Sequence, residues 1–75
     1  MTYHRIPNDD GISTEDIQPG ADLSGADLKN ADLSDANLKN TDLSHAIINF
    51  ADLGSADLKN ADLSDADLSH AKLKN

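Results

Sequence analysis

Small aliphatic side chains recur every five residues over most of the chain. From residue 21 to residue 75 the sequence divides without insertion into eleven five-residue units. The first position of a unit is Ala in ten units and Thr41 in the other, and the third position is Leu in ten and Ile48 in the other. The other three positions are nearly all polar or Gly. The units are ADLSG, ADLKN, ADLSD, ANLKN, TDLSH, AIINF, ADLGS, ADLKN, ADLSD, ADLSH and AKLKN.

A period of five fits neither regular secondary structure. At about 100° per residue, successive Leu side chains would be about 140° apart around a helix and would form no stripe. On a continuous strand, side chains five residues apart point to opposite faces. The pattern instead predicts a short extended segment in each unit, whose first and third residues share a face, followed by a turn. The chain is therefore expected to coil, with Ala and Leu inside.

The gapless repetition of A(D/N)Lxx resembles the pentapeptide-repeat family, and the resemblance covers residues 21–75. It implies the fold of that family, an all-β, right-handed quadrilateral β-helix in which four units form the sides of one square coil. Eleven units then make about 2.75 coils. Thr41, at an inward position, needs a partner for its hydroxyl. The central column would hold Leu23, Leu28, Leu33, Leu38, Leu43, Ile48, Leu53, Leu58, Leu63, Leu68 and Leu73.

The chain divides into residues 1–20, which do not fit the repeat and are called the leader below, and the repeat itself at 21–75. Within the leader, a Ser13 N-cap and the stop signal Pro19–Gly20 predict a short helix at 13–18 that lies over the first coil. The alternative is a disordered leader. The side chains expected to close the top and extend along one side are Ile12, Ile17, Tyr3 and Ile6.

The last coil would present its lower rim and unpaired backbone to water, and such open edges invite association. Three interpretations follow: the chain is a fragment of a longer solenoid, it stacks end to end on a copy of itself, or its uncapped final coil frays. The candidate end-to-end interface residues are Leu58, Leu63, Leu68 and Leu73.

Charge and composition narrow the functional classes. Fourteen acidic and six basic residues give a net charge of −8, which argues against direct binding to nucleic acid or to an anionic membrane. Cys is absent, so disulfides and thiolate metal sites are excluded. No apolar run approaches the roughly 20 residues that span a bilayer, and no signal peptide is recognisable. These features predict a cytoplasmic protein.

Candidate chemistry on the outer positions is sparse. Residues twenty apart would be neighbours on successive coils, so that Asp22, Asp42 and Asp62 would form a column. We expect a solvated column rather than a metal site, because no Gly-rich calcium-binding signature is present. His45 and His70 fall in different columns and would not share a metal. No nucleophile is paired with a base, so the sequence predicts a non-enzyme without metal or cofactor.

One unit, AIINF, departs from the pattern. Ile48 takes the inward position, so Ile47 and Phe50 are expected to face outward as a compact apolar spot. Three explanations stay open. The leader covers this spot, a partner protein or second copy contacts it, or the two residues have drifted without consequence.

The function expected from these features is that of a small structural or protein-interaction module, built as a rigid acidic solenoid. A protein partner or self-association is expected, with a possible homo-oligomer through the C-terminal coil. The family resemblance also implies an alternative, since some pentapeptide-repeat proteins imitate DNA and modulate DNA gyrase. The short length of the repeat disfavours this alternative.

Overall fold

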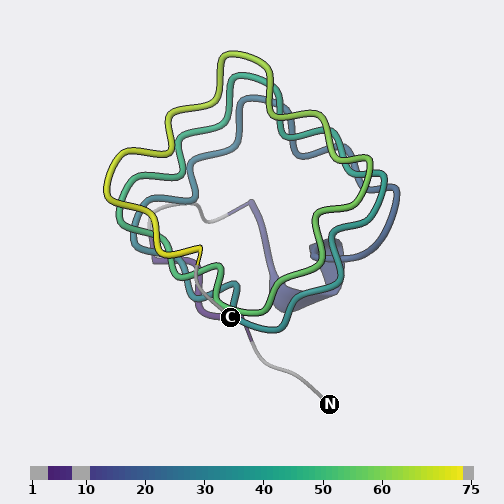
Figure 1. Ribbon diagram of the computed structural model, residues 1–75. Coiled ribbons are helices and arrows are strands. Elements are labelled where there is room, and N and C mark those ends of the chain that lie inside the picture. Colours follow the sequence, from purple (N-terminus) through teal and green to yellow (C-terminus); the bar gives the residue numbers. More distant parts are fainter. Residues whose placement is uncertain (1–3, 8–10, 74–75) are drawn as a thin grey trace.

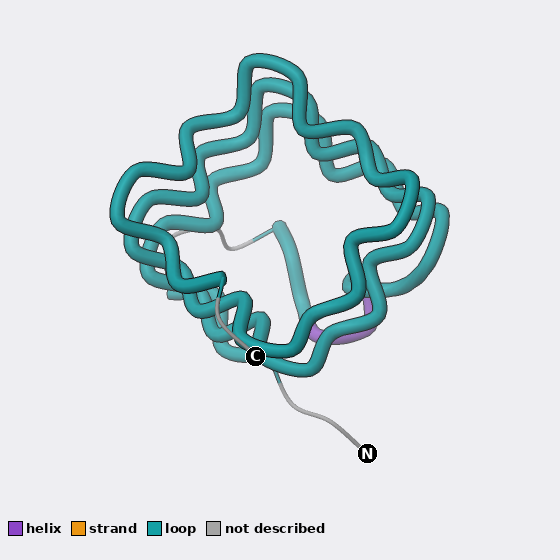
Figure 2. The backbone as a smooth tube through the Cα atoms, viewed as in Figure 1, coloured by secondary structure: helices purple, strands orange, loops and turns teal. Residues whose placement is uncertain are grey.

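The repeat winds as a stack of square coils, with a turn at the end of each five-residue unit (Figure 1, Figure 2). This computed structural model describes residues 4–7 and 11–73. Parallel bridges join residues that are twenty apart, so four units complete one coil and each coil lies against the next. The bridges are Asp22–Asp42, Asp27–Ile47, Asp32–Asp52, Asn37–Asp57, Asp42–Asp62, Ile47–Asp67 and Asp52–Lys72.

Backbone hydrogen bonds between coils follow one rule wherever a unit has a described coil above or below it. The second-position N–H donates to the first-position C=O of the preceding coil, as from Asp42 to Ala21 at 2.9 Å. The third-position N–H donates to the second-position C=O of the next coil, as from Leu23 to Asp42 at 2.8 Å. The fifth-position N–H donates to the fourth-position C=O of the next coil, as from Gly25 to Ser44 at 2.8 Å. Three of the five N–H groups of a unit thus hold the stack together.

A fourth N–H closes the corner. The first-position N–H donates back to the third-position C=O of the preceding unit, as from Ala26 to Leu23 at 3.1 Å. The fifth residue of each corner has a positive φ, from +57° to +69° between Gly25 and His70. This is the left-handed region that type II turns require and that Gly, Asn and Asp adopt most readily. The prevalence of these residues at the fifth position therefore follows from the turn.

The secondary structure consists of isolated bridges and one 3-10 turn, η1 (Thr14–Asp16), and the described residues contain no continuous strand or sheet. The β-helix expected from the sequence thus lacks extended strands. The reason is geometric, because each side offers only three residues between corners. Two stacked sides therefore share a single bridge.

The interior is filled by the first- and third-position side chains. Leu28, Leu33, Leu38, Leu43 and Ile48 are completely buried, and the first-position Ala side chains of the first two coils are buried or half-buried beside them. The hydroxyl of buried Thr41 donates to the Leu38 C=O at 2.8 Å, which supplies the partner that its burial demands.

The aliphatic column continues into the last coil with decreasing burial. Leu58, Leu63 and Leu68 are half-buried, and Leu73 is 55% exposed. These residues lie on the lower side of the stack, where no further coil is described. They are the residues that the sequence marks for an end-to-end interface.

The leader lies over the top of the first coil. The Arg5 C=O accepts a hydrogen bond from the Asp32 N–H at 2.8 Å, and the His4 Nδ1 lies 3.1 Å from the Asp32 C=O. Residues 11–13 then cross the mouth of the coil to η1 (Figure 1). Ile17 is buried, and Ile6 and Ile12 pack against the core. Tyr3 lies outside the described residues.

Around residue 13 the structure has a single turn rather than a helix over 13–18. The Ser13 N–H donates to Asp16 Oδ2 at 2.9 Å, and η1 ends at Asp16. The hydrogen-bond rule of the repeat begins soon afterwards. The Ala21 N–H donates to the Gln18 C=O at 3.2 Å, and the Gly20 N–H donates to the Lys39 C=O, in the next coil, at 2.9 Å. The repeating backbone therefore starts before the repeating side chains do.

Replacing Leu38 by Ala should lower the free energy of unfolding by about 2–5 kcal/mol, because a completely buried Leu leaves a cavity that a closed coil cannot collapse. Leu58→Ala is the matched control, since Leu58 lies on the same side one coil lower and is only half-buried. Chemical denaturation followed by circular dichroism measures both. An equal or larger loss at Leu58 would contradict this account of the core.

Candidate functional site

The outer wall, made of the second, fourth and fifth side chains of each unit, is organised by the second-position oxygen. Asp32 Oδ1 accepts the Ser34 N–H at 3.1 Å and the Ser34 hydroxyl at 2.6 Å. This bond satisfies the fourth-position N–H, which the stack and the corner leave free. The same N–H···Oδ1 bond is made by Asp22, Asp27, Asn37, Asp42, Asp52, Asp57, Asp62 and Asp67.

These bonds shift the ionisation of the wall carboxyl groups. The Ser34 hydroxyl, and after it the Ser34 N–H, hold the pKa of Asp32 below its ordinary value of 3.8. The hydroxyl and N–H of the serine two residues on lower the pKa in the same way at Asp22, Asp62 and Asp67. The second-position Asp side chains are thus structural acceptors, and these four stay ionised at neutral pH.

The described part of the chain contains no group of three or more His, Cys, Asp or Glu side chains that could hold a metal ion. Asp22, Asp42 and Asp62 do form the column expected from the sequence. Each of them, however, already uses Oδ1 to accept the N–H of the following serine. Among the described residues no helix is long and apolar enough to cross a membrane.

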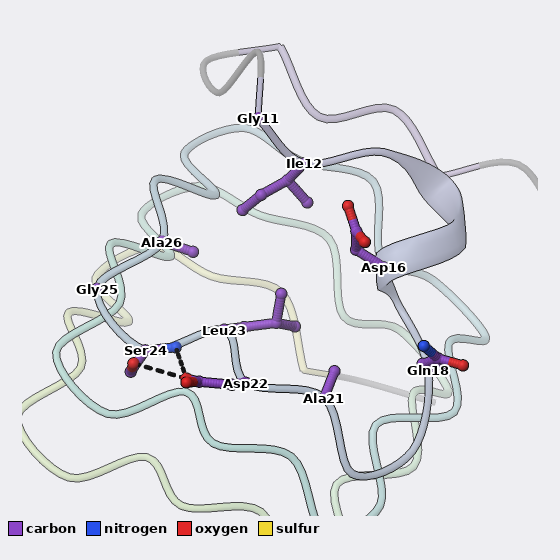
Figure 3. Close-up of a pocket in the computed structure, with 10 residues that line it drawn as sticks. All are labelled: Gly11, Ile12, Asp16, Gln18, Ala21, Asp22, Leu23, Ser24, Gly25 and Ala26. Carbon is purple, nitrogen blue, oxygen red and sulfur yellow. Dashed lines mark hydrogen bonds between the residues drawn. The ribbon is translucent and has the colours of Figure 1, made fainter.

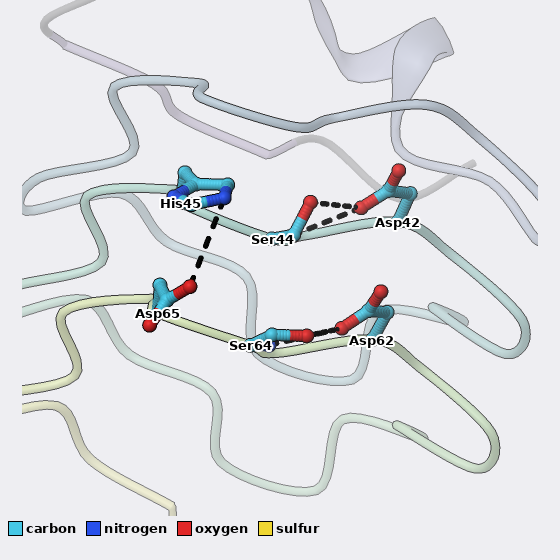
Figure 4. A network of polar contacts seen from close by, with 6 residues as sticks. All are labelled: Asp42, Ser44, His45, Asp62, Ser64 and Asp65. Atoms are coloured by element: carbon cyan, nitrogen blue, oxygen red, sulfur yellow. Dashed lines mark hydrogen bonds and ion pairs between the residues drawn. The ribbon is translucent and has the colours of Figure 1, made fainter.

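His45 lies at a corner beside this column (Figure 4). Its Nε2 is 3.8 Å from Asp65 Oδ2, in the coil below. The neighbouring hydroxyls of Ser44 and Ser64 donate to Asp42 and Asp62 rather than to the imidazole. No Ser–His–Asp relay of the kind that activates a nucleophile is therefore formed in this network.

Ile47 and Phe50 face outward in the middle coil, with 41% and 54% of their surface exposed. The Phe50 ring stacks on the His70 ring, with centroids 4.7 Å apart and planes 9° apart. The described part of the leader contacts the top of the first coil and leaves both apolar side chains exposed. The two residues, called the apolar patch below, thus form one surface feature with His70.

Asn49, which lies between Ile47 and Phe50, makes hydrogen bonds that differ from those of the other fourth-position residues. Ile47 offers no oxygen to accept the Asn49 N–H, so the usual bond within the unit is lost. The Asn49 side chain instead donates from Nδ2 to Asp67 Oδ2 at 3.2 Å and to Ser69 Oγ at 3.1 Å, in the coil below. This bridge between coils was not predicted from the sequence. Its only signal is an Asn at a position that elsewhere holds Ser, Lys or Gly.

A groove of about 510 Å³ opens at the top of the stack (Figure 3). It lies between the leader and the first unit, and is called the top groove below. Ile12 and Asp16 line it from the leader, and Asp22, Leu23 and Ala26 line it from the coil. The sequence pattern did not predict this groove, because its shape depends on the path of the leader across the coil.

Stacked coils of five-residue units with inward aliphatic side chains define a class of solenoid proteins. The family model for pentapeptide repeats matches this chain with eight copies over residues 21–60 and 36–75. The chain therefore belongs to the pentapeptide-repeat family. Neither the search of curated proteins nor the search of solved structures gave a match.

The free energy of unfolding should fall as the pH drops below about 3.8, the ordinary value from which the pKa of Asp32 is lowered. A carboxyl group with a depressed pKa in the folded state stabilises the fold above its unfolded pKa. That contribution is lost as the pH falls through the folded pKa. Chemical denaturation at about pH 7 and at about pH 2.5 measures the difference.

The variant Ser34→Ala should reduce this pH dependence, because it removes the largest cause of the shift at Asp32. Ser55→Ala is a suitable control, since Ser55 is exposed at a fifth position and its side chain makes none of these bonds to a carboxylate. If Ser34→Ala keeps the full pH dependence, the hydroxyl bonds do not govern the acid response.

Proposed function

We propose that this protein is a non-catalytic interaction module, a right-handed quadrilateral β-helix that acts as a rigid acidic scaffold and binds a partner protein through its wall. The filled interior and the family membership support a structural role. The observation that carries the proposal is the apolar patch, where Ile47 and Phe50 interrupt an otherwise polar wall.

The patch is unfavourable to the fold in two ways. Phe50 has a φ of +61°, like the fifth residue of the other corners, but Phe adopts this left-handed region less readily than the Asn and Asp found at several of those corners. Ile47 also gives up the acceptor for the Asn49 N–H, where a net hydrogen bond contributes about 0.5–1.5 kcal/mol. Asp at position 47 would restore the acceptor, and Asn at position 50 would adopt the left-handed φ at a lower cost. An exposed apolar pair that the fold does not require favours a contact with a partner.

The surroundings of the patch indicate the chemistry of the partner. Asp27 precedes Ile47 in its column and Asp67 follows it, and the chain carries a net charge of −8. A fitting partner therefore presents an apolar anchor, such as Leu or Phe, flanked by Lys or Arg. Aromatic anchors and complementary charge are typical of small protein interfaces. A basic amphipathic helix is the simplest segment with this chemistry.

The DNA-mimicking alternative has one observation in its favour. The side of the stack that contains Asp22, Asp42, Asp62 and Asp65 carries four carboxylates and no Lys or Arg. The molecule measures 30 × 24 × 24 Å. Even its longest dimension matches only about nine base pairs at 3.4 Å each. A short interaction module therefore fits these dimensions better than an imitation of a duplex.

The double variant Ile47→Asp with Phe50→Asn should weaken binding of a basic amphipathic peptide by about tenfold or more, because the apolar anchor site is lost. A suitable probe is a Leu–Lys helix of about 14 residues, and calorimetry measures the affinity. The variant adds one negative charge. Binding driven by charge alone would therefore strengthen, so the direction of the change separates the two causes.

Two controls complete this experiment. A peptide of the same composition, shuffled so that it has no apolar face, should bind the unaltered protein weakly. The free energy of unfolding of the double variant should be unchanged or higher, since the acceptor is restored and Asn tolerates the left-handed φ better than Phe. Equal binding of the helix by the variant and the unaltered protein would exclude the patch as the docking site.

A further inference from the structure

On the lower edge of the last described coil, each unit has the same set of unpaired backbone donors and acceptors. In the unit 61–65, the N–H groups of Leu63 and Asp65 and the C=O of Ala61 have no partner within the described chain. The units on either side of it, 56–60 and 66–70, repeat this pattern. Each of these units therefore offers two donors and one acceptor downward.

The upper edge of the first unit offers the inverse. Above Asp22 and Ser24, the described part of the chain leaves unpaired one donor, the Asp22 N–H, and two acceptors, the C=O groups of Asp22 and Ser24. A lower edge can therefore bond an upper edge completely. Two lower edges brought together would leave N–H groups facing N–H groups, which a buried interface does not tolerate.

The leader determines which part of the upper edge a second molecule can reach. The Asp32 N–H already donates to the Arg5 C=O, and the Asp32 C=O lies within hydrogen-bond distance of the His4 ring. The C=O of Lys39 already accepts the Gly20 N–H. Over the first unit, by contrast, the top groove of about 510 Å³ is open. This volume is within the usual range of binding pockets, about 300–1,000 Å³.

We propose that copies of this chain associate head to tail, with residues 71–73 of one copy pairing in the top groove with Asp22 of the next. The pairing would have the same backbone hydrogen bonds that join one coil to the next inside the molecule. The Ala71 C=O would accept the Asp22 N–H, as the Ala21 C=O accepts the Asp42 N–H. The Leu73 N–H would donate to the Asp22 C=O, as Leu23 donates to Asp42. This is addition of a strand to an open edge.

The side chains of 71–73 match the groove. Lys72 is the basic residue among the eleven second positions, which otherwise hold Asp, Asn or Ile. In this register it lies over the Asp22 carboxylate, whereas a unit with Asp at that position would bring two like charges together. Leu73 is 55% exposed, and its inward side chain would enter the groove between Ile12 and Leu23 (Figure 3).

Such an interface is heterologous, so each added copy presents the same two edges again and the assembly does not close. The proposed pairing involves the two ends of the stack and leaves the apolar patch on the side of the stack exposed. It adds self-association to the proposed function. Its failure would not affect docking at Ile47 and Phe50, because the two experiments change different residues.

Charge exchange between Asp22 and Lys72 tests the pairing. Sedimentation of the full chain should show an average mass that rises steadily with concentration and falls as salt is added. Asp22→Lys and Lys72→Asp should each weaken association by about tenfold, because each places like charges together. An equimolar mixture of the two variants should recover it, since Lys at position 22 of one variant then faces Asp at position 72 of the other.

Asp42→Lys is the matched control. It makes the same change of charge in the same column and loses the same bond to a following serine, but it lies one coil away from the edge. Its association should equal that of the unaltered chain. A monomer at every concentration, a mass that stops at the dimer, or a mixture that does not recover association would each overturn the proposal. So would equal weakening by Asp42→Lys.

Discussion

The register of twenty residues between bonded neighbours is the constraint on which the rest of the structure depends. Within a unit, three N–H groups bond adjacent coils, one closes a corner, and one is satisfied by the second-position carboxylate, as in Asp32 and Ser34. An insertion of one residue would break the bonds between coils and turn an inward Leu toward the wall. The unbroken repetition of eleven units is thus a condition of the fold, because buried backbone groups must all be paired.

The same register separates the molecule into surfaces with different properties. On the four sides, the backbone groups between stacked coils are paired, and second-position carboxylates such as Asp62 bond their own unit. At the two ends of the described stack, backbone groups such as the Asp22 N–H and the Leu63 N–H have no partner among the described residues. A partner that binds a side must therefore use side chains alone. A partner that binds an end can use the backbone as well, which makes the ends selective for another extended chain.

Sequence periodicity was sufficient to predict what repeats. It placed the Leu column inside and Ile47 and Phe50 outside, as the structure has them. The resemblance to the family supplied the number of units in a coil, and the bridges between residues twenty apart agree with it. These features follow from one geometric rule applied many times, so each unit supports the inference drawn from the others.

The features that could not be predicted from the sequence are contacts that each occur only once in the structure. The contact of Arg5 with Asp32, the start of the repeating backbone at Gln18 and the bridge from Asn49 to Ser69 each depend on a single local arrangement. The top groove depends on where residues 11–13 cross the coil, and the leader has no repeat from which this path could be derived. A regular pattern carries no information about a contact that is made only once.

Departures from the repeat are therefore where a specific function has to be sought. A unit that matches its neighbours is explained by the fold, because Ala, Leu and the second-position Asp all serve the backbone. Phe50, an aromatic residue at a corner position, and Lys72, a basic residue at a position that elsewhere holds Asp, Asn or Ile, do not serve it in this way. Phe50 lies on a side of the stack and Lys72 lies at an end, so the two residues would contact different kinds of partner. In a structure this regular, an irregular exposed residue is the feature that a partner can distinguish.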